Sequence, residues 1–361
     1  MLYLSLLGSD KLKKNKKAII ISSSILVGIL ILFYVVAVII YNVSFNYRCT
    51  SDEALMCKME DFDNLERKRY EFETKKGNNL VGYLYSNEII EEKGLVVFAH
   101  GLGGGGQRGY LDIFDYLSSN GYYVFAYDAT ANDESEGKVI GGLPQGIIDL
   151  DYAINFTKTI EEVKDLPLML MGYSWGGLSV SNVLNYHDEV KAVVAISGWN
   201  KSLNLIEYHG CQMVGPLGKL LLPFASIHEH IKYGKYASST AMKAFEKTNA
   251  KIMIVHSEDD TTVPIEYGYD TYYEKYSSDD RFIFKHYTNR GHNDIFKSEE
   301  GAKYYNGFID ELNDFKRNEV DLTKEKILHY IDKNLDREKL ASKLDYELFA
   351  EIIEMYNSCL N

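Results

Sequence analysis

The sequence predicts an α/β protein with a mainly parallel sheet, helices on both faces of the sheet, and one apolar helix before it. Three observations lead to this prediction. Short apolar runs alternate with helical segments after about residue 94, an uncharged run of 24 residues fills 18–41, and the chemically suggestive residues follow the apolar runs. A chain of 361 residues is long enough for one large core with appendages.

Charge and cysteine content exclude several classes of function. The formal net charge of −13 disfavours nucleic acid as a partner. Four cysteines without a C-x-x-C pair are too few for a disulfide scaffold and do not indicate a zinc site. Cys49 and Cys57 are close in sequence, so a bridge between them and two free thiols both remain open.

The apolar run at 18–41 predicts a transmembrane anchor, because 24 helical residues can cross a hydrocarbon core of roughly 30 Å. A cleaved signal peptide would have a shorter apolar run and an A-x-A-like site. Residues 1–17 carry five lysines and one aspartate, a net +4 that leaves −17 for the rest. This asymmetry predicts a single-pass protein of the cell membrane with a cytoplasmic basic tail and the rest of the chain outside the cell.

The remaining chain is expected to form a polar stalk over 42–69 and the main α/β domain over 70–316. Alternating residues at 70–74 and 80–86, joined by KGNN, predict a hairpin. Near-continuous apolar runs then predict buried parallel strands at 94–100, 122–128, 167–173, 190–197, 251–257 and 281–287. Helices are expected near 110–119, 144–159, 175–186, 265–276 and 296–317.

Two segments stand outside the alternation of strands and helices. Residues 199–247 form a long insertion, which is either a packed helical elaboration or a lid that shapes the substrate site. Residues 317–361 form a C-terminal extension with two expected helices after 320. Leu348, Ile352, Ile353 and Tyr356 have helical spacing, which is typical of a buried stripe.

The stretch MGYSWGGLSV, residues 171–180, places Ser174 between Gly172 and Gly176 in the pattern G-x-S-x-G. An apolar run precedes the serine and a helical pattern follows it. A strand-to-helix turn of this kind is so tight that its flanking positions need glycine, and it leaves the serine hydroxyl exposed at the strand end. The pattern therefore favours Ser174 as a nucleophile over a small residue in a glycine-rich loop.

A serine nucleophile needs a base, and the base needs a carboxylate that holds its tautomer. His292, in NRGHND, follows the last apolar run, and HSEDDTTVP follows the run before it with Asp259 and Asp260. The chain order Ser, Asp, His is the order expected when such a triad sits at the ends of parallel strands. Spacing does not decide between Asp259 and Asp260, since either can instead cap the following turn.

Backbone N–H groups are needed for the negative charge that develops on an attacked carbonyl. Trp175, directly after the candidate nucleophile, would supply one donor. The loop HGLGGGG, 100–106, follows an earlier apolar run, and Leu102 is the candidate for the second donor. This loop lacks the G-K-[ST] of a phosphate-binding P-loop, and no H-E-x-x-H metal motif is present in the sequence.

Taken in order, these motifs resemble the α/β-hydrolases of the serine aminopeptidase-like, esterase and lipase group. The likeness covers about 70–316 and rests on HGLGGGG, AYDATANDESEG, GYSWGG, HSEDDTTVP and the GH pair before Asn293. It implies Ser174 as nucleophile and His292 as base, and it selects Asp260, four residues before the proline of D-x-x-V-P. Thr130 and Asn132 stand where this family has an arginine and a glycine, so that loop is expected to differ.

The resemblance implies a membrane-anchored serine hydrolase that cleaves a carboxylic ester or amide through an acyl-enzyme, with no metal or organic cofactor. Its partners would be a small ester or short peptide and the lipid bilayer around 18–41. Esters are favoured, because the sequence offers no evident charged anchor for a peptide terminus. An aminopeptidase-like enzyme, an acyltransferase and a non-catalytic binding scaffold remain as alternatives on the same fold.

Overall fold

The computed structural model describes residues 2–74 and 77–360. Within this part, the strands form one eight-stranded sheet in the order β1-β2-β4-β3-β5-β6-β7-β8. β1 pairs with β2, and β2 with β4, in antiparallel fashion, and all pairs from β4 to β8 are parallel. The strands are β1 (Leu65–Glu73), β2 (Asn79–Asn87), β3 (Gly94–Ala99), β4 (Tyr122–Tyr127), β5 (Leu168–Tyr173), β6 (Ala192–Ile196), β7 (Lys251–Ser257) and β8 (Phe282–Tyr287). The predicted α/β class is confirmed.

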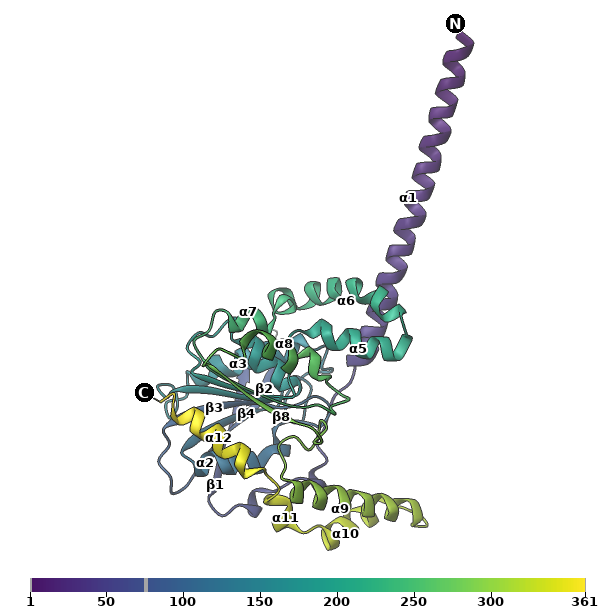
Figure 1. Ribbon diagram of the computed structural model, residues 1–361. Helices are drawn as coiled ribbons and strands as arrows, with labels where there is room; N and C mark the ends of the chain where they lie inside the picture. Colours follow the sequence, from purple (N-terminus) through teal and green to yellow (C-terminus); the bar gives the residue numbers. More distant parts are fainter. Residues whose placement is uncertain (1, 75–76, 361) are drawn as a thin grey trace.

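Helices cover both faces of the sheet, which explains why its central strands are apolar at every position. In β3, Leu95 and Val97 pack into one core, whereas Val96 and Phe98 pack into the other. The first core includes α3 (Pro144–Thr157), α4 (Trp175–Val183), α7 (Ala241–Phe245) and α8 (Tyr269–Tyr276). The second includes α2 (Leu111–Ser119), α9 (Glu299–Asn318) and α12 (Tyr346–Asn357), and Figure 1 shows α2 and α12 below the sheet.

The first helix, α1 (Leu2–Phe45), projects away from the rest of the molecule (Figure 1). Its part from Asn15 to Phe45 is long and apolar enough to cross a membrane, and an 18-residue window within it has a mean hydropathy of 2.9. The 18–41 run lies wholly inside this helix.

The segment expected to be a stalk, 42–69, does not form a free spacer. Its first residues complete α1, and its last ones begin β1. Between them, the Arg48 guanidinium donates hydrogen bonds to the carbonyls of Ser135 and Gly137 at 2.9 and 3.0 Å. Cys49 and Cys57 are buried free thiols, so no bridge joins them.

The 199–247 insertion is helical and lies next to the end of α1. It contains α5 (Ser202–Val214), α6 (Leu217–Tyr233) and α7, and Figure 1 shows α5 and α6 beside the lower part of α1. The C-terminal extension holds α10 (Lys324–Asn334), a short α11 (Arg337–Ala341) that the helical spacing did not predict, and α12. The predicted stripe on α12 is buried: Leu348, Ile352, Ile353 and Tyr356.

Candidate active site

Ser174 occupies the turn between β5 and α4, directly after the last residue of the strand. Its backbone has φ +54° and ψ −113°, a conformation that residues other than glycine rarely adopt. Its N–H donates to the Ile196 carbonyl at 2.8 Å, which ties the turn to β6. The turn therefore holds Ser174 at the carboxyl end of β5, beside the end of β6.

Two glycines beside Ser174 make this turn possible. A Cβ on Gly176 would lie 1.8 Å from the Ala99 carbonyl oxygen at the end of β3. A Cβ on Gly172 would lie 2.2 Å from the Gly176 carbonyl oxygen. Any side chain at either position would therefore force β5, α4 and β3 apart.

His292 joins Ser174 to Asp260 through two hydrogen bonds. Its Nε2 lies 2.9 Å from Ser174 Oγ, and its Nδ1 lies 2.7 Å from Asp260 Oδ2. The three residues follow β5, β7 and β8, whose carboxyl ends meet at one edge of the sheet. The structure thus brings together the serine, the histidine and one of the two candidate aspartates.

Asp259 has a different set of partners. Its Oδ1 accepts hydrogen bonds from Ser257 Oγ at 2.6 Å and from the Gly291 N–H at 2.8 Å. It therefore holds the backbone of the loop that carries His292, without reaching the imidazole. Spacing left this choice open, and the structure resolves the contact in favour of Asp260.

The environment of Asp260 keeps its carboxylate charged. Burial by itself raises the pKa of this group, but interactions with His256 and His292 outweigh burial and hold the pKa well below its usual range. Asp260 Oδ1 also accepts the N–H groups of Thr262 and Val263, each at 2.9 Å. A charged, fixed carboxylate favours the tautomer of His292 that carries its proton on Nδ1 and presents Nε2 to the serine.

The candidate oxyanion donors lie next to Ser174. Trp175 is the first residue of α4, where a backbone N–H has no acceptor within the helix. Leu102 lines the same cavity as Ser174. His100 fixes the start of its loop, since Nδ1 contacts the Gly101 carbonyl at 2.7 Å and Nε2 accepts the Ala129 N–H at 3.0 Å.

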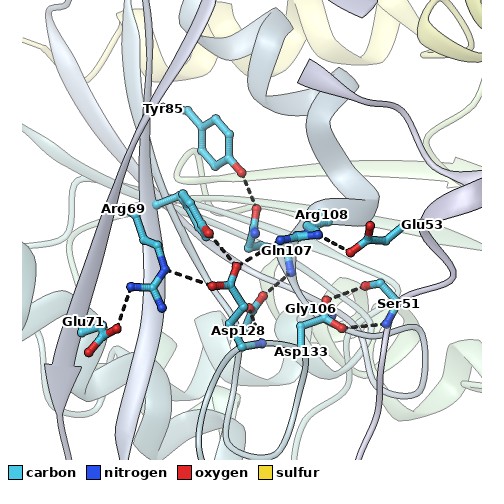
Figure 2. Close-up of polar contacts among 12 residues, drawn as sticks. Ser51, Glu53, Arg69, Glu71, Tyr85, Gly106, Gln107, Arg108, Asp128 and Asp133 are labelled. Atoms are coloured by element: carbon cyan, nitrogen blue, oxygen red, sulfur yellow. Dashed lines mark hydrogen bonds and ion pairs between the residues drawn. The ribbon is translucent and has the colours of Figure 1, made fainter. Parts of the chain in front are cut away.

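A polar network holds the far end of the HGLGGGG loop (Figure 2). Asp133 Oδ2 accepts the Gly106 N–H at 2.8 Å, and Asp128 Oδ1 accepts the Gln107 N–H at 2.9 Å. Asp133 Oδ1 also accepts the N–H of Ser51 at 2.6 Å, so the segment after α1 contributes to the network. Asp128 and Asp133 belong to the AYDATANDESEG loop, which therefore supports the HGLGGGG loop despite its departures from the family pattern.

Two cavities open beside Ser174 and His292. The larger, about 690 Å³, lies under α5, α6 and the end of α1. The smaller, about 460 Å³, is bordered by Gly103 and Gly104 and by Lys297 and Lys343. Among residues 2–74 and 77–360, no group of three or more His, Cys, Asp or Glu is arranged to hold a metal ion.

Comparison with solved structures identifies the architecture. An acylaminoacyl peptidase from Pyrococcus horikoshii superposes with a TM-score of 0.51 at 18% identity, over 74% of this chain and 45% of that one. The Pyrococcus furiosus esterase Pf2001 superposes with a TM-score of 0.50 at 18% identity, over 70% of this chain and 93% of that one. The chain has the α/β-hydrolase fold.

A family model described as serine aminopeptidase, S33, matches residues 90–226 of the chain, which include Leu102 and Ser174. The comparison with curated proteins gives no match. The family model, taken with the fold, supports a serine hydrolase and is compatible with both ester and peptide substrates.

Two residues that support the site were not predicted from the sequence. The Tyr173 hydroxyl donates to the His292 carbonyl at 2.9 Å, and His256 Nε2 lies 3.4 Å from Asp260 Oδ2. Both residues lie at the ends of predicted strands and within the motifs GYSWGG and HSEDDTTVP, but neither was given a role. Their position at the carboxyl end of a strand, next to a candidate site residue, is the signal that would have found them.

Proposed function

We propose that this protein is a membrane-anchored serine hydrolase that cleaves carboxylic esters through an acyl-enzyme on Ser174. The observation that carries the proposal is the hydrogen-bonded series Ser174–His292–Asp260 at the carboxyl ends of three parallel strands. Ser174 supplies a hydroxyl that can attack, His292 an imidazole 2.9 Å from that hydroxyl that can take its proton, and Asp260 a buried carboxylate that orients the imidazole.

In this mechanism, Ser174 Oγ attacks the substrate carbonyl while its proton moves to His292 Nε2. The Oγ–carbon bond forms, and the N–H groups of Leu102 and Trp175 stabilise the negative charge on the carbonyl oxygen. The carbon–oxygen bond to the alcohol then breaks, and the alcohol leaves with the proton from Nε2. Water, deprotonated by His292, releases the acid and restores the serine.

The larger cavity favours esters over peptides. Its lining, within the part of the chain that the structure describes, contains no Asp, Glu, Lys or Arg side chain. An aminopeptidase would need a carboxylate to bind the charged terminus of its substrate, whereas an apolar acyl group needs only this apolar surface. The esterase and the peptidase among the structural neighbours are each compatible with the triad chemistry.

A comparison of p-nitrophenyl esters with aminoacyl-p-nitroanilides tests this assignment. The wild-type protein should hydrolyse the esters with the higher kcat/KM, and Ser174→Ala should reduce ester hydrolysis by at least about 10³-fold. Full activity in Ser174→Ala would remove this serine from the mechanism. A preference for the anilides would replace the esterase assignment with a peptidase.

We further propose that residues 18–41 anchor the protein in the cell membrane, with the basic tail in the cytoplasm and the catalytic domain outside. The length and hydropathy of α1 support the span, and the five lysines before it support the orientation. A tag at the C-terminus should be removed by protease added to intact cells. A tag that stays protected until the cells are lysed would reverse the orientation.

A further inference from the structure

The cavity over Ser174 is walled in part by the helix that we propose as the membrane anchor. Ala37 and Ile40 of α1 line it together with Leu205 of α5 and Leu221 of α6, and Ser174 and His292 lie on its wall. An anchor that served only to tether the domain would have no reason to contribute to the substrate site. Here the anchor, the insertion and the candidate nucleophile share one apolar space of about 690 Å³.

Helix α6 of the insertion packs along α1 between Phe33 and Tyr41. The Tyr41 hydroxyl donates to Glu229 Oε1 at 2.8 Å, and the rings of Phe33 and Phe224 are in edge contact at 6.0 Å. Phe33 and Tyr41 are eight residues apart, which is about 12 Å along a helix. α6 therefore lies beside the last third of the 18–41 run and not only beside its end.

This packing has a consequence for the depth of the insertion in a bilayer. If 18–41 crosses the hydrocarbon core, Phe33 lies about 12 Å inside the surface next to the catalytic domain, which is the level of lipid acyl chains. α6 exposes large apolar side chains, including Leu220, Ile227 and Ile231 at 52%, 50% and 72%. Such a surface is unfavourable in water and favourable in contact with lipid.

The two sides of Ser174 differ in polarity. The anchor-walled cavity is lined mainly by apolar side chains. The smaller cavity of about 460 Å³ also has apolar lining, but it adds backbone of the glycine loop and the side chains of Lys297 and Lys343, which form ion pairs with Asp294 and Asp112. A substrate that spans the serine would thus place an apolar chain on one side and a polar group on the other. This is the arrangement that an amphiphilic ester requires.

We infer that the substrate is a lipid ester of the surrounding bilayer, whose long acyl chain occupies the cavity between α1, α5 and α6. The inference rests on the proposed serine hydrolase and names its substrate class. The acyl carbonyl lies at Ser174, the chain extends along Ala37 and Ile40 of the anchor, and the polar alcohol part lies toward Lys297 and Lys343.

A chain-length series on the full-length protein in nanodiscs tests the position of the chain. We compare kcat/KM for p-nitrophenyl dodecanoate and acetate in Ile40→Trp, which fills the cavity, and in Ile39→Trp. Ile39 is the neighbour of Ile40 on α1, but its side chain is 57% exposed and does not line the cavity. In Ile40→Trp, the ratio of kcat/KM for dodecanoate to that for acetate should fall at least about tenfold, because the loss of two buried methylenes has an effect of that size. In Ile39→Trp, the same ratio should stay within about twofold of the wild-type value.

A second pair of variants, with substitutions on α6, tests the same inference if the α1 variant does not fold. Leu222 lines the cavity, whereas Leu220 is exposed. Leu222→Trp should lower the ratio and Leu220→Trp should not. Equal ratios within both pairs, with acetate still hydrolysed, would overturn the inference and leave the proposed function intact. A folded wild-type protein that hydrolyses no ester of any length would overturn both.

Delivery from the bilayer is tested by the location of the substrate. A long-chain acylglycerol in the same nanodisc as the enzyme should be hydrolysed at least about tenfold faster than the same amount in separate nanodiscs, because lateral encounter replaces transfer through water. Equal initial rates in the two arrangements would contradict delivery from the bilayer.

Discussion

The backbone of Ser174 is held in a conformation that costs on the order of 1–3 kcal/mol for a residue other than glycine. Close packing maintains it: the elbow is hydrogen-bonded to Ile196, and the backbone of Gly176 lies directly against Ala99. The strain directs Oγ toward His292. At this turn between β5 and α4, tertiary contacts therefore override the conformational preference of a residue other than glycine.

Gly176→Ala tests this packing. The added methyl group would collide with the Ala99 carbonyl, so the thermal midpoint should fall by the equivalent of about 3 kcal/mol or more, with loss of soluble protein in the extreme case. Gly104→Ala is the control, since nothing lies within 4 Å of a Cβ at that position. Equal stability of the two variants, measured by thermal unfolding, would contradict the close approach.

Asp260→Asn and Asp259→Asn separate the two aspartates. Asp260→Asn should lower kcat by about 10³–10⁴-fold, because the amide favours the wrong tautomer of His292. Asp259→Asn should lower it less than about tenfold, because it loses only part of the support of Gly291. Ester hydrolysis measures both, and a larger loss in Asp259→Asn would reverse the assignment.

The sequence alone was sufficient to place Ser174, His292 and the pair of aspartates at strand ends, because chain order and strand periodicity are local signals. Spacing could not choose between Asp259 and Asp260, and only the resemblance to the hydrolase group favoured Asp260. That choice depends on how the loop after β7 turns, and both aspartates accept backbone N–H groups there. Side-chain direction in such a loop is set by tertiary contacts rather than by spacing.

A buried carboxyl group, that of Asp128, holds the backbone of Gln107 directly after the HGLGGGG loop. Burial, together with the nearby carboxylates of Asp133 and Glu134, raises the pKa of Asp128 to about 7, although two backbone N–H groups oppose the shift. The folded protein therefore keeps a proton on Asp128 that the unfolded chain releases near pH 4. The stabilisation is present at low pH and is lost as the pH rises toward about 7.

Asp128→Asn should remove this pH dependence. The variant loses one hydrogen bond and should be less stable at pH 5, but its thermal midpoint should vary less between about pH 4 and pH 7 than that of the wild-type protein. Thermal unfolding across this range measures the effect, with Asp310→Asn on the exposed face of α9 as the control. The same slope in Asp128→Asn and wild type would contradict a protonated Asp128.

Elements with strong periodicity were predicted from the sequence, and elements fixed by tertiary contacts were not. The central strands and α2, α3 and α9 were expected within a few residues of their observed bounds. The packing of the segment after α1 was missed, because its contacts are made by Arg48 and Ser51 to a loop more than 80 residues away. Composition alone does not distinguish a polar segment that binds distant parts of the chain from a spacer surrounded by water.

At the scale of the whole molecule, α1 and the insertion meet through a buried polar contact. The Tyr41 hydroxyl and Ser202 Oγ both donate to Glu229 Oε1, at 2.8 and 2.6 Å, and the Glu229 side chain is fully buried. This contact joins the end of α1 to α6 and, through Ser202, to the start of α5. It also holds α6 in place over the cavity beside Ser174.

Tyr41→Phe should weaken this junction. Removing one donor from a buried carboxyl group should cost about 1–3 kcal/mol and lower the thermal midpoint of the full-length protein in detergent micelles. Tyr47→Phe is the control, because Tyr47 is 38% exposed. An unchanged midpoint in Tyr41→Phe would mean that the contact does not stabilise the junction.

The central claim is that Ser174 is the nucleophile, and active-site labelling tests it most directly. The full-length protein is treated with a fluorophosphonate, and the modified peptide is identified by mass spectrometry. We predict one adduct on Ser174, absent from a folded Ser174→Ala variant. A folded wild-type protein that acquires no adduct, or an adduct on another serine with Ser174 unmodified, would contradict the claim.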